Sequence, residues 1–444
     1  MLAFGTDGVR GLAGAELTPD LALALGRAAA RVLCRDGHGQ VLIGRDPRRS
    51  GTMLVAALAA GLAAEGVDVV DVGVLPTPAL AHLAAVGGVP AAMVSASHNP
   101  FPDNGIKLFA AGGRKLADDV EREIEGLLGA PASVPPRTGG DIGSIAAGGS
   151  LGAYVDHVVE AVEGRTLTGL HVVLDCANGA ASEIGPGIFQ RLGVSVRTVS
   201  AEPDGVNIND GCGSTHIDRL AAQVVAAKAD CGIALDGDAD RCLAVDADGA
   251  VVDGDQLLAL LALDLRSRGR LAEDTVVVTV YSNLGFHHAM AAEGINVVTT
   301  ATGDRYVLDA LDAGGLTLGG EQSGHIIQRH LASTGDGLLT AVCALDALHR
   351  SGRTLAEAAA VVRRLPQTLV NVRVTAPGRI SLDGLDGVWD EVAAVESELG
   401  DDGRVLLRPS GTEPLVRVMV EAPTEQLADA HAARIRSAVE RAFA

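Results

Sequence analysis

The residues in this chain best suited to chemistry are three aspartates at alternate positions. Asp236, Asp238 and Asp240 occur in DGDADR (236–241), directly after an apolar run that is predicted to be a strand. Alternating carboxylate oxygens are ligands that a hard cation such as Mg²⁺ prefers. Without a cation, three neighbouring negative charges would raise one another's pKa values or lower the stability of the fold. The motif therefore favours a Mg²⁺ site, and a solvated acidic turn stays open as the alternative.

A candidate nucleophile lies in the polar segment SASHNP (95–100), which follows the apolar run 90–94. Open α/β sheets place their ligands at the carboxyl ends of strands, so Ser97 would be well positioned there. An ordinary Ser/Asn/Pro turn is the alternative. A serine hydrolase fits poorly, because the chain lacks the G-x-S-x-G motif and the adjacent pair Ser97 and His98 does not make a triad.

Three further loops carry groups that bind phosphate or sugar hydroxyls. RPSGTEP (408–414) offers a guanidinium, two hydroxyls and glycine-permitted backbone N–H groups, which suit a phosphate cradle. GEQSGH (320–325) offers hydrogen-bonding side chains, and FGTDGVRG (4–11) supplies a further cation. Taken singly, each could be a solvated loop or a hairpin. The candidate residues outside the first two motifs are Arg10, Lys107, Arg241, Glu321, Ser323, His325, Arg408, Ser410, Gly411 and Thr412.

The elements that must position these loops alternate between helices and strands. A helix is predicted to begin after Thr18 as N-cap, with Pro19 at its first position, and to end before Gly37. The strand 40–44, the helix 52–64 and the strand 67–72 follow, and similar alternation recurs after residues 170 and 255. It predicts βαβ units and mostly parallel sheets.

Two segments depart from this alternation. Residues 127–149 are rich in Gly, Pro, Ala and Ser and are interpreted as a linker or surface excursion. After residue 365 the sequence changes to valine-rich alternation followed by a terminal helix from about Thr424, which predicts a smaller α+β domain.

Composition limits the environment and the partners. A length of 444 residues suggests about three domains at roughly 150 residues each. The formal net charge of −21 argues against a nucleic acid or membrane partner, since both require a basic surface. The six cysteines form no CxxC pair, which predicts free thiols in a reducing compartment, and we expect the cytoplasm. The longest apolar stretch, 53–64, is too short to span a bilayer.

These segments, in this order, resemble the α-D-phosphohexomutase superfamily along essentially the whole chain. The resemblance implies three similar mixed-sheet α/β domains and a smaller C-terminal α+β domain around a central active-site cleft. Domain I (1–150) would carry a phosphoserine loop and domain II (151–255) the metal-binding loop. Domain III (256–365) would carry a sugar-binding loop and domain IV (366–444) a phosphate-binding loop.

The resemblance also assigns a role to each candidate residue. Ser97 would be the phosphorylated serine, and its phosphate would contact the single Mg²⁺ held by the three aspartates. Lys107 and His325 are both candidates for the general acid and base. The remaining roles are charge neutralisation around the transferring group by Arg10, Lys107 and Arg241, binding of sugar hydroxyls by Glu321 and Ser323, and binding of the other phosphate by Arg408, Ser410, Gly411 and Thr412.

Three variants within the motifs narrow the implied activity. GEQSGH, NINDGCGSTH (207–216) and STGDGLLTA (333–341) resemble members of the superfamily that act on glucosamine phosphates. This implies interconversion of glucosamine 6-phosphate and glucosamine 1-phosphate for UDP-N-acetylglucosamine synthesis, with a sugar bisphosphate as intermediate and activator. The alternatives are a phosphomannomutase or phosphoglucomutase, a Mg²⁺ phosphatase and a non-catalytic sugar-phosphate-binding protein. A homodimer stays open.

Overall fold

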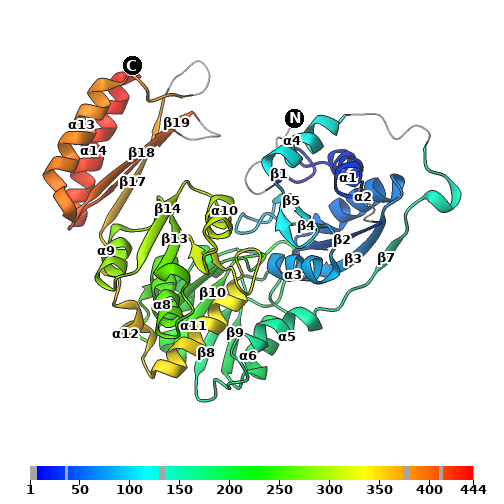
Figure 1. The fold of residues 1–444 in the computed structure, drawn as a ribbon, viewed down its shortest axis with the longest axis horizontal. Helices are drawn as coiled ribbons and strands as arrows, with labels where there is room; N and C mark the ends of the chain where they lie inside the picture. Colours follow the sequence, from blue (N-terminus) through cyan, green and yellow to red (C-terminus); the bar gives the residue numbers. More distant parts are fainter. Residues whose placement is uncertain (1–7, 36–38, 130–135, 375–379, 410–413, 444) are drawn as a thin grey trace. The chain divides into compact units, whose positions relative to one another are not determined.

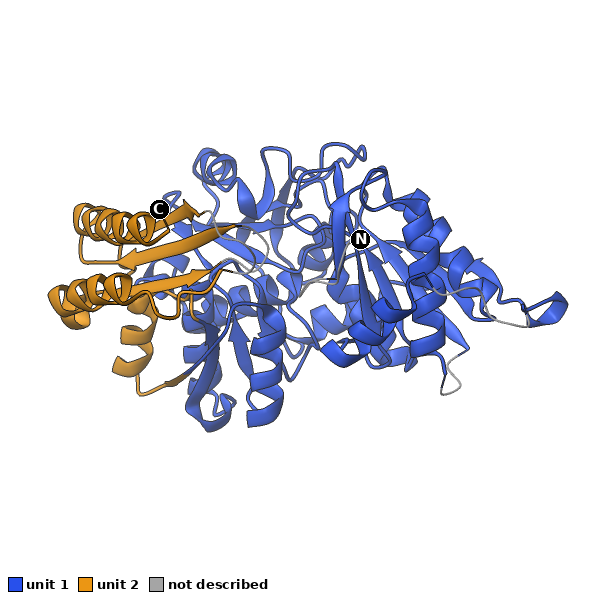
Figure 2. Cartoon of the chain, turned by 90° about the horizontal axis from the view of Figure 1, so that it is seen from above, with its two compact units in different colours: residues 1–279, 298–360 blue, residues 280–297, 361–444 orange. Residues whose placement is uncertain are grey.

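The structure is a computed structural model that describes residues 8–35, 39–129, 136–374, 380–409 and 414–443. Contacts between its elements divide the chain into two compact units (Figure 2). Unit 1 comprises residues 1–279 and 298–360, and unit 2 comprises residues 280–297 and 361–444. The domain boundaries that we predicted near residues 150, 255 and 366 divide the chain more finely and stay predictions.

The first sheet of unit 1 has seven strands in mixed directions (Figure 1). Its order is β1-β5-β4-β2-β3-β7, with β6 paired to β5. β2, β3, β4 and β7 run parallel, whereas β5 is antiparallel to both β4 and β1. The strands are β1 (Val9–Leu12), β2 (Gln40–Arg45), β3 (Asp68–Val74), β4 (Ala91–Val94), β5 (Asp103–Ala110), β6 (Arg114–Lys115) and β7 (Ile145–Ala147), and the helices are α1 (Pro19–Leu33), α2 (Gly51–Ala64), α3 (Thr77–Gly87) and α4 (Asp118–Leu127).

Local sequence explains the close packing of α1 against α2. Thr18 caps α1 as predicted, because its side chain accepts a hydrogen bond from Leu21 N–H and Pro19 takes the first position. The two helices touch through glycines: a Cβ on Gly26 would lie 2.3 Å from Leu58 O, and one on Gly61 would lie 2.2 Å from Leu23 O. Only glycine permits this approach.

The segment 127–149 is more than the predicted linker. Residues 145–147 form β7, which pairs in parallel with β3 at the edge of the first sheet. All three β7 residues are exposed, so the strand has no alternation of apolar and polar positions by which it could be recognised.

Two more sheets complete unit 1. The second has the order β12-β11-β10-β8-β9, with β10 and β11 paired antiparallel on either side of the loop that carries the three aspartates. The third has the order β14-β13-β15-β16. The strands are β8 (His171–Asp175), β9 (Ser195–Val199), β10 (Cys231–Leu235), β11 (Cys242–Asp246), β12 (Val251–Val252), β13 (Thr275–Thr279), β14 (Asn296–Thr300), β15 (Leu318–Gly320) and β16 (Ile326–Gln328), and the helices are α5 (Gly152–Glu160), α6 (Gly185–Arg191), α7 (Asp218–Ala227), α8 (Gly254–Ser267), α10 (Asp304–Gly314), α11 (Gly337–Ser351) and α12 (Leu355–Ala359). The helix α9 (Leu284–Ala292) belongs to unit 2.

Unit 2 is a three-stranded antiparallel sheet packed against helices, as the valine-rich alternation predicted. The order is β17-β19-β18, with β17 (Gln367–Arg373), β18 (Arg404–Pro409) and β19 (Leu415–Glu421). α13 (Asp386–Leu399) and α14 (Glu425–Ala442) lie side by side against it (Figure 1). The single tryptophan of the chain, Trp389, lies in α13 and donates to Leu382 O at 3.0 Å.

The fully buried Glu421 connects this sheet to the segment 280–297 within unit 2. Its Oε2 accepts hydrogen bonds from Leu284 N at 2.8 Å and Arg404 Nε at 2.7 Å. Its Oε1 accepts one from Gln367 Nε2 at 3.0 Å. A buried carboxylate needs such partners, so Glu421 fixes the start of α9 to the end of the central strand β19.

Two expectations from composition can be compared with the structure. All six cysteines are free thiols, and four of them are buried. Among the described residues, no helix combines the length and the apolar character that a bilayer span requires.

Candidate active site

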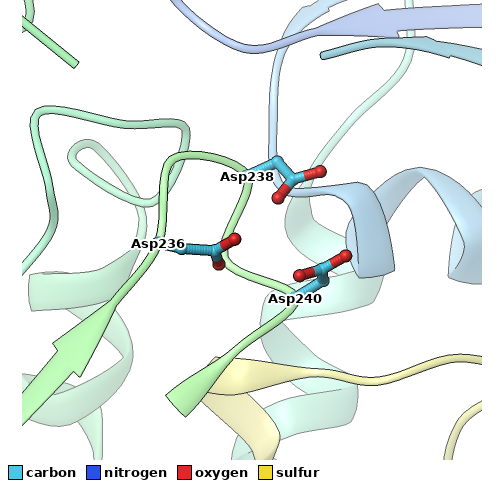
Figure 3. Close-up of side chains that lie close together, drawn as sticks. All are labelled: Asp236, Asp238 and Asp240. Carbon is cyan, nitrogen blue, oxygen red and sulfur yellow. The ribbon is translucent and has the colours of Figure 1, made fainter. Parts of the chain in front are cut away.

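The loop after β10 brings three carboxylates together. Asp236, Asp238 and Asp240 are buried, and Figure 3 shows their side chains around a common space. One oxygen of each lies within 4.8 Å of the others, and in the described part of the chain they form the one group of three acidic, histidine or cysteine ligands close enough to hold a metal ion. Gly237 lets the loop curl, because a Cβ there would lie 2.7 Å from Ser97 O.

The hydrogen bonding of this cluster fits a hard cation. Asp238 Oδ1 and Asp240 Oδ1 are buried and have no hydrogen-bond partner among the described residues. A buried carboxylate oxygen without a partner is energetically unfavourable. Mg²⁺ takes carboxylate oxygens as ligands, and such a cation would satisfy both atoms.

Ser97 lies against the same loop. It follows β4 in a left-handed backbone conformation with φ of 50°, and it is 1% exposed. Its Oγ donates to Asp236 Oδ2 at 2.5 Å. A non-glycine residue with such a φ must be held by its surroundings, and such residues concentrate at functional sites. The serine that the sequence nominated as nucleophile thus touches the carboxylate cluster directly.

Lys107 and Thr77 hold the other side of the cluster. Lys107, on β5, places its Nζ 3.2 Å from Asp238 Oδ2 and 3.3 Å from Asp240 Oδ2. Thr77, at the start of α3, donates from Oγ1 to Asp238 Oδ2 at 2.6 Å. Since a buried ammonium requires nearby negative charge, the cluster also keeps Lys107 in place.

His325 lies between two carboxylates. Its Nδ1 is 3.7 Å from Asp240 Oδ2, and its Nε2 is 3.3 Å from Asp304 Oδ2 at the start of α10. Burial lowers the pKa of this imidazole, but Asp240 and Asp304 outweigh that effect and raise the pKa to about 9. The same Nε2 accepts a hydrogen bond from Gly335 N at 3.1 Å, so this nitrogen acts as an acceptor in the structure.

The electrostatics of the three aspartates are unequal. Burial, together with the charges of Asp240 and Asp238, raises the pKa of Asp236 well above its usual value. Burial acts in the same direction on Asp240, yet Lys107 and His325 hold the pKa of that carboxyl well below its usual value. Without metal, Asp236 therefore binds a proton more readily than Asp240 does, and a bound cation would compete with that proton.

The predicted cations Arg10 and Arg241 lie near Ser97. Arg241 N–H donates to Asp236 Oδ1 at 3.1 Å. Burial and the charges of Arg241 and Arg10 lower the pKa of His98 to about 4. The imidazole beside Ser97 is therefore neutral at physiological pH.

The predicted sugar-binding turn lies between β15 and β16. Glu321 Oε2 accepts from Ser323 Oγ at 3.2 Å, and its Oε1 accepts from Gly303 N at 3.3 Å. Both side chains are partly exposed. Cys242 N donates to Gly324 O at 3.0 Å, which fixes the turn beside β11 and the end of the carboxylate loop.

The predicted phosphate-binding loop belongs to unit 2. Arg408 lies in β18, with its guanidinium carbon 5.7 Å from the centre of the Tyr281 ring. Ser410, Gly411 and Thr412 lie outside the described residues, as do residues 4–7 of the first motif. The structure therefore gathers the Ser97, Lys107, aspartate, Arg241 and His325 side chains and leaves the predicted role of unit 2 a prediction.

Sequence reasoning missed several residues around this site. Thr77 and Asp304 contact predicted site residues, and Arg48 and Asn209 contact the Ser97 loop. The segment GRDPR (44–48) could have been noticed, because it ends a strand parallel to the one before Ser97 and so reaches the same edge of the sheet. Asn209 lies in NINDGCGSTH, which was interpreted only as a variant.

Comparison with known families covers nearly the whole chain. The phosphoglucomutase/phosphomannomutase family matches with its alpha/beta/alpha domain I over residues 1–133, domain II over 152–249 and domain III over 253–365. Its C-terminal domain matches over 369–438. These matches confirm the predicted fold class of three α/β domains and a smaller C-terminal domain.

Individual proteins are similar over the same length. A phosphoglucosamine mutase of Saccharopolyspora erythraea is 56% identical over 441 residues, covering 98% of each chain, and one of Nocardia farcinica is 55% identical over 448 residues, covering 96% of this chain and 97% of the other. A phosphoglucomutase/phosphomannomutase family protein from Burkholderia thailandensis has a similar structure, with a TM-score of 0.82, 28% identity and coverage of 99% of this chain and 97% of the other. At 20% identity, an N-acetylphosphoglucosamine mutase of Aspergillus fumigatus shares the fold, with a TM-score of 0.73 and coverage of 100% and 96%. The chain belongs to the phosphoglucosamine mutase family, within the phosphoglucomutase/phosphomannomutase proteins.

Proposed function

We propose that the chain interconverts glucosamine 6-phosphate and glucosamine 1-phosphate through a phosphoserine at Ser97. The observation that carries this proposal is the contact of Ser97 Oγ with Asp236 Oδ2, 2.5 Å away, inside a buried group of three aspartates. A binding protein has no need of a nucleophile held against a metal-ligating cluster. The identity of 56% and 55% to two phosphoglucosamine mutases supports the choice of glucosamine as the sugar.

The reaction consists of two phosphoryl transfers. In the first, the P–Oγ bond of phosphorylated Ser97 breaks and a P–O bond forms to the 1-oxygen of glucosamine 6-phosphate; the proton of that hydroxyl leaves to a base, and the released Ser97 Oγ takes up a proton. In the second, the 6-phosphoryl group of the bisphosphate passes to Ser97 Oγ, whose proton leaves to a base, and a proton is added to the 6-oxygen. Glucosamine 1-phosphate is released and the phosphoserine is restored, so the bisphosphate is both intermediate and activator.

The side chains around Ser97 suit this chemistry. Phosphoryl transfer needs positioning and neutralisation of charge more than covalent participation by the protein. Asp236, Asp238 and Asp240 would hold one Mg²⁺, which would supply positive charge to the phosphoryl oxygens. The proposed roles of the other residues are proton transfer by Lys107 or His325, charge neutralisation by Arg10, Lys107 and Arg241, binding of sugar hydroxyls by Glu321 and Ser323, and binding of the second phosphate by Arg408, Ser410, Gly411 and Thr412.

The decisive assay measures turnover of glucosamine 6-phosphate with Mg²⁺ and a catalytic trace of glucosamine 1,6-bisphosphate. Glucose 6-phosphate and mannose 6-phosphate are assayed in parallel. A pocket that discriminates one charged hydrogen-bonding group should favour glucosamine by roughly tenfold to a hundredfold in kcat/KM. A preference for glucose or mannose phosphates would contradict the proposed sugar and leave the mutase chemistry standing. Free phosphate as the main product would instead indicate a phosphatase.

A further inference from the structure

A fully buried arginine holds the loop that carries Ser97. Arg48 Nη2 donates to Ser97 O at 2.9 Å and to Asn99 O at 2.8 Å. Its Nη1 donates to Pro100 O at 2.5 Å and to Asp103 O at 3.1 Å. One guanidinium therefore binds four carbonyl oxygens between residues 97 and 103.

Arg48 is itself fixed by a buried carboxylate that also reaches the amino side of the loop. Asp46 Oδ2 accepts from Arg48 Nε at 2.8 Å and from Ser95 Oγ at 2.7 Å. Ser95 Oγ in turn accepts from Ser97 N at 2.9 Å. The backbone of Ser97 is thus held at both its N–H and its carbonyl group.

Asn209, in the loop between β9 and α7, binds two of the same carbonyl oxygens. Its Nδ2 donates to Ser97 O at 2.8 Å and to Asn99 O at 3.0 Å. Because both partners are acceptors, the amide must present its nitrogen to them. Asn209 is 6% exposed, and its own backbone N donates to Ala177 O at 2.9 Å.

Asn209 also lies against the carboxylate loop. A Cβ on Gly237 would lie 2.9 Å from Asn209 Nδ2 and 2.7 Å from Ser97 O. The Ser97 loop, the Asn209 side chain and the carboxylate loop therefore meet at one point. A substitution of Asn209 should therefore change the position of Ser97 relative to the three aspartates, while Ser97 and the aspartates themselves remain.

We propose that Arg48 and Asn209 are positioning residues for Ser97, acting as a clamp on its carbonyl group and on that of Asn99. The proposal rests on the function proposed above. Ser97 adopts a left-handed conformation that an L-residue rarely takes, so its Oγ direction depends on what fixes its backbone. Phosphoryl transfer requires in-line geometry, and a displacement of about 1 Å can slow such a step about a hundredfold.

The sharpest test changes Asn209. Asn209 has a φ of 58°, so Asn209→Gly keeps a backbone conformation that glycine accepts and removes the side chain with its amide. We expect kcat to fall by roughly tenfold to a hundredfold while KM for glucosamine 6-phosphate changes little. The variant Asn209→Asp has a side chain of nearly the same shape. Its kcat should fall further than that of Asn209→Gly, because it places a carboxylate against two carbonyl oxygens.

Asn207 provides the matched control on the same segment. Its Nδ2 donates to Glu202 O at 2.9 Å and its Oδ1 accepts from Asp204 N at 3.0 Å, so its side chain bonds only within its own turn. Asn207→Ala should leave kcat near the wild-type value. An equal fall in kcat in Asn207→Ala and Asn209→Gly would mean that loosening of the segment 207–216 slows the reaction, and that the clamp does not.

Arg48 provides an independent test by chemical rescue. Arg48→Ala empties a buried site of guanidinium size, and millimolar guanidinium should restore part of its kcat. Because this variant leaves the buried Asp46 without its partner, Arg48→Lys is measured in parallel, with the melting temperature of each variant as the check on folding. An Arg48→Lys variant that folds and turns over at the wild-type rate would contradict the clamp.

Single-turnover kinetics separate the clamp from a merely structural role. Ser97 is first phosphorylated with glucosamine 1,6-bisphosphate, the excess is removed, and transfer to glucosamine 6-phosphate is followed by quenched flow. We expect slower transfer in Asn209→Gly, with saturation at the same substrate concentration as the wild type. A wild-type transfer rate in both Asn209 variants would overturn the clamp while leaving the proposed function intact.

The wild-type protein distinguishes the two proposals. If it turns over another hexose phosphate in place of glucosamine phosphate, only the sugar is wrong, and the clamp is tested on that substrate. If no hexose bisphosphate phosphorylates Ser97, the proposed function fails, and the clamp fails with it.

Discussion

The hydroxyl of Ser97 faces a carboxylate, and this determines which reactions the residue can support. Its Oγ lies 2.5 Å from Asp236 Oδ2 and 3.5 Å from His98 Nδ1. Burial and two arginines lower the pKa of His98 to about 4, which leaves this imidazole a weak base. The arrangement differs from a hydrolase triad, in which histidine takes the serine proton. It suits a serine oxygen that accepts a phosphoryl group beside a cation.

Ser97→Ala should abolish mutase turnover and all phosphorylation of the protein, because it removes the oxygen that carries the group. Intact mass after incubation with the bisphosphate should show the added phosphate on the wild type alone. The change in the free energy of unfolding should stay within about 2 kcal/mol, since one hydrogen bond is lost. Normal turnover in Ser97→Ala would exclude the phosphoserine route.

Asp238→Asn should weaken Mg²⁺ binding by roughly tenfold or more, because one of three anionic ligands is lost. Isothermal titration with Mg²⁺ measures this without reference to activity. Asp246→Asn is the matched control: Asp246 ends the neighbouring strand β11 and accepts from Asp248 N and Ala250 N, outside the cluster. Equal Mg²⁺ affinity in wild type and Asp238→Asn would contradict the metal assignment.

At the level of elements, two helix N-termini hold the carboxylate loop. Thr77 N in α3 donates to Asp238 O at 2.9 Å, and Gly337 N in α11 donates to Ala239 O at 2.9 Å. The first N–H groups of a helix have no partner inside it, so they are free to bind loop carbonyls. Asp336 caps α11, and Tyr154 of α5 donates its hydroxyl to both Asp336 oxygens at 3.0 Å.

The cap of α11 should make stability depend on pH. Burial raises the pKa of Asp336 from 3.8 to about 6, so the folded protein holds this proton more tightly than the unfolded chain. The resulting stabilisation is complete below the pKa that Asp336 has in the unfolded chain. It is lost as the pH rises through the pKa that Asp336 has in the folded protein. Relative to Asp336→Asn, the wild type should lose on the order of 3 kcal/mol in unfolding free energy between about pH 3 and pH 7. Chemical denaturation of both proteins across this range measures their free energies of unfolding. A difference between the two free energies that does not change with pH would contradict the prediction.

An element could be predicted from the sequence when the residues that determine it lie within the element itself. The start of α1 follows from Thr18 and Pro19, which act on their own helix, and was predicted correctly. The exposed strand β7 depends on pairing with β3 and has no pattern of its own. Asn209 meets Ser97 only after two sheets come together, 112 residues apart in the chain. Spacing within a motif could therefore predict the aspartate cluster, whereas the residues that hold the Ser97 loop could not be found in this way.

At the level of the whole molecule, the segment 280–297 belongs with the C-terminal part of the chain. It lies within the stretch that matches alpha/beta/alpha domain III, and Glu421 and Arg404 attach it to the C-terminal sheet. Motif order along the chain could predict the family, but not this grouping, because Glu421 contacts Leu284 across 137 residues of sequence.

Hydrogen exchange should therefore group residues 280–297 with 361–444. In Glu421→Gln the carboxylate becomes an amide, one of its acceptor oxygens is lost, and amides of α9 and of β17 to β19 should exchange faster together. The α1 and α2 amides, in unit 1, are the internal control and should be unchanged. Faster exchange in the C-terminal sheet with unchanged α9 would show that the two segments open independently.

The position of Trp389 gives unit 2 its own optical signal. It is the only tryptophan in the chain, it lies in α13 of unit 2, and the residue is 43% exposed with its indole N–H bound to Leu382 O. Emission excited selectively at tryptophan therefore reports on unit 2, while far-ultraviolet circular dichroism sums the helices of both units. Comparing the two signals during denaturation shows, without any label or added residue, whether the units lose their structure in one transition or in two.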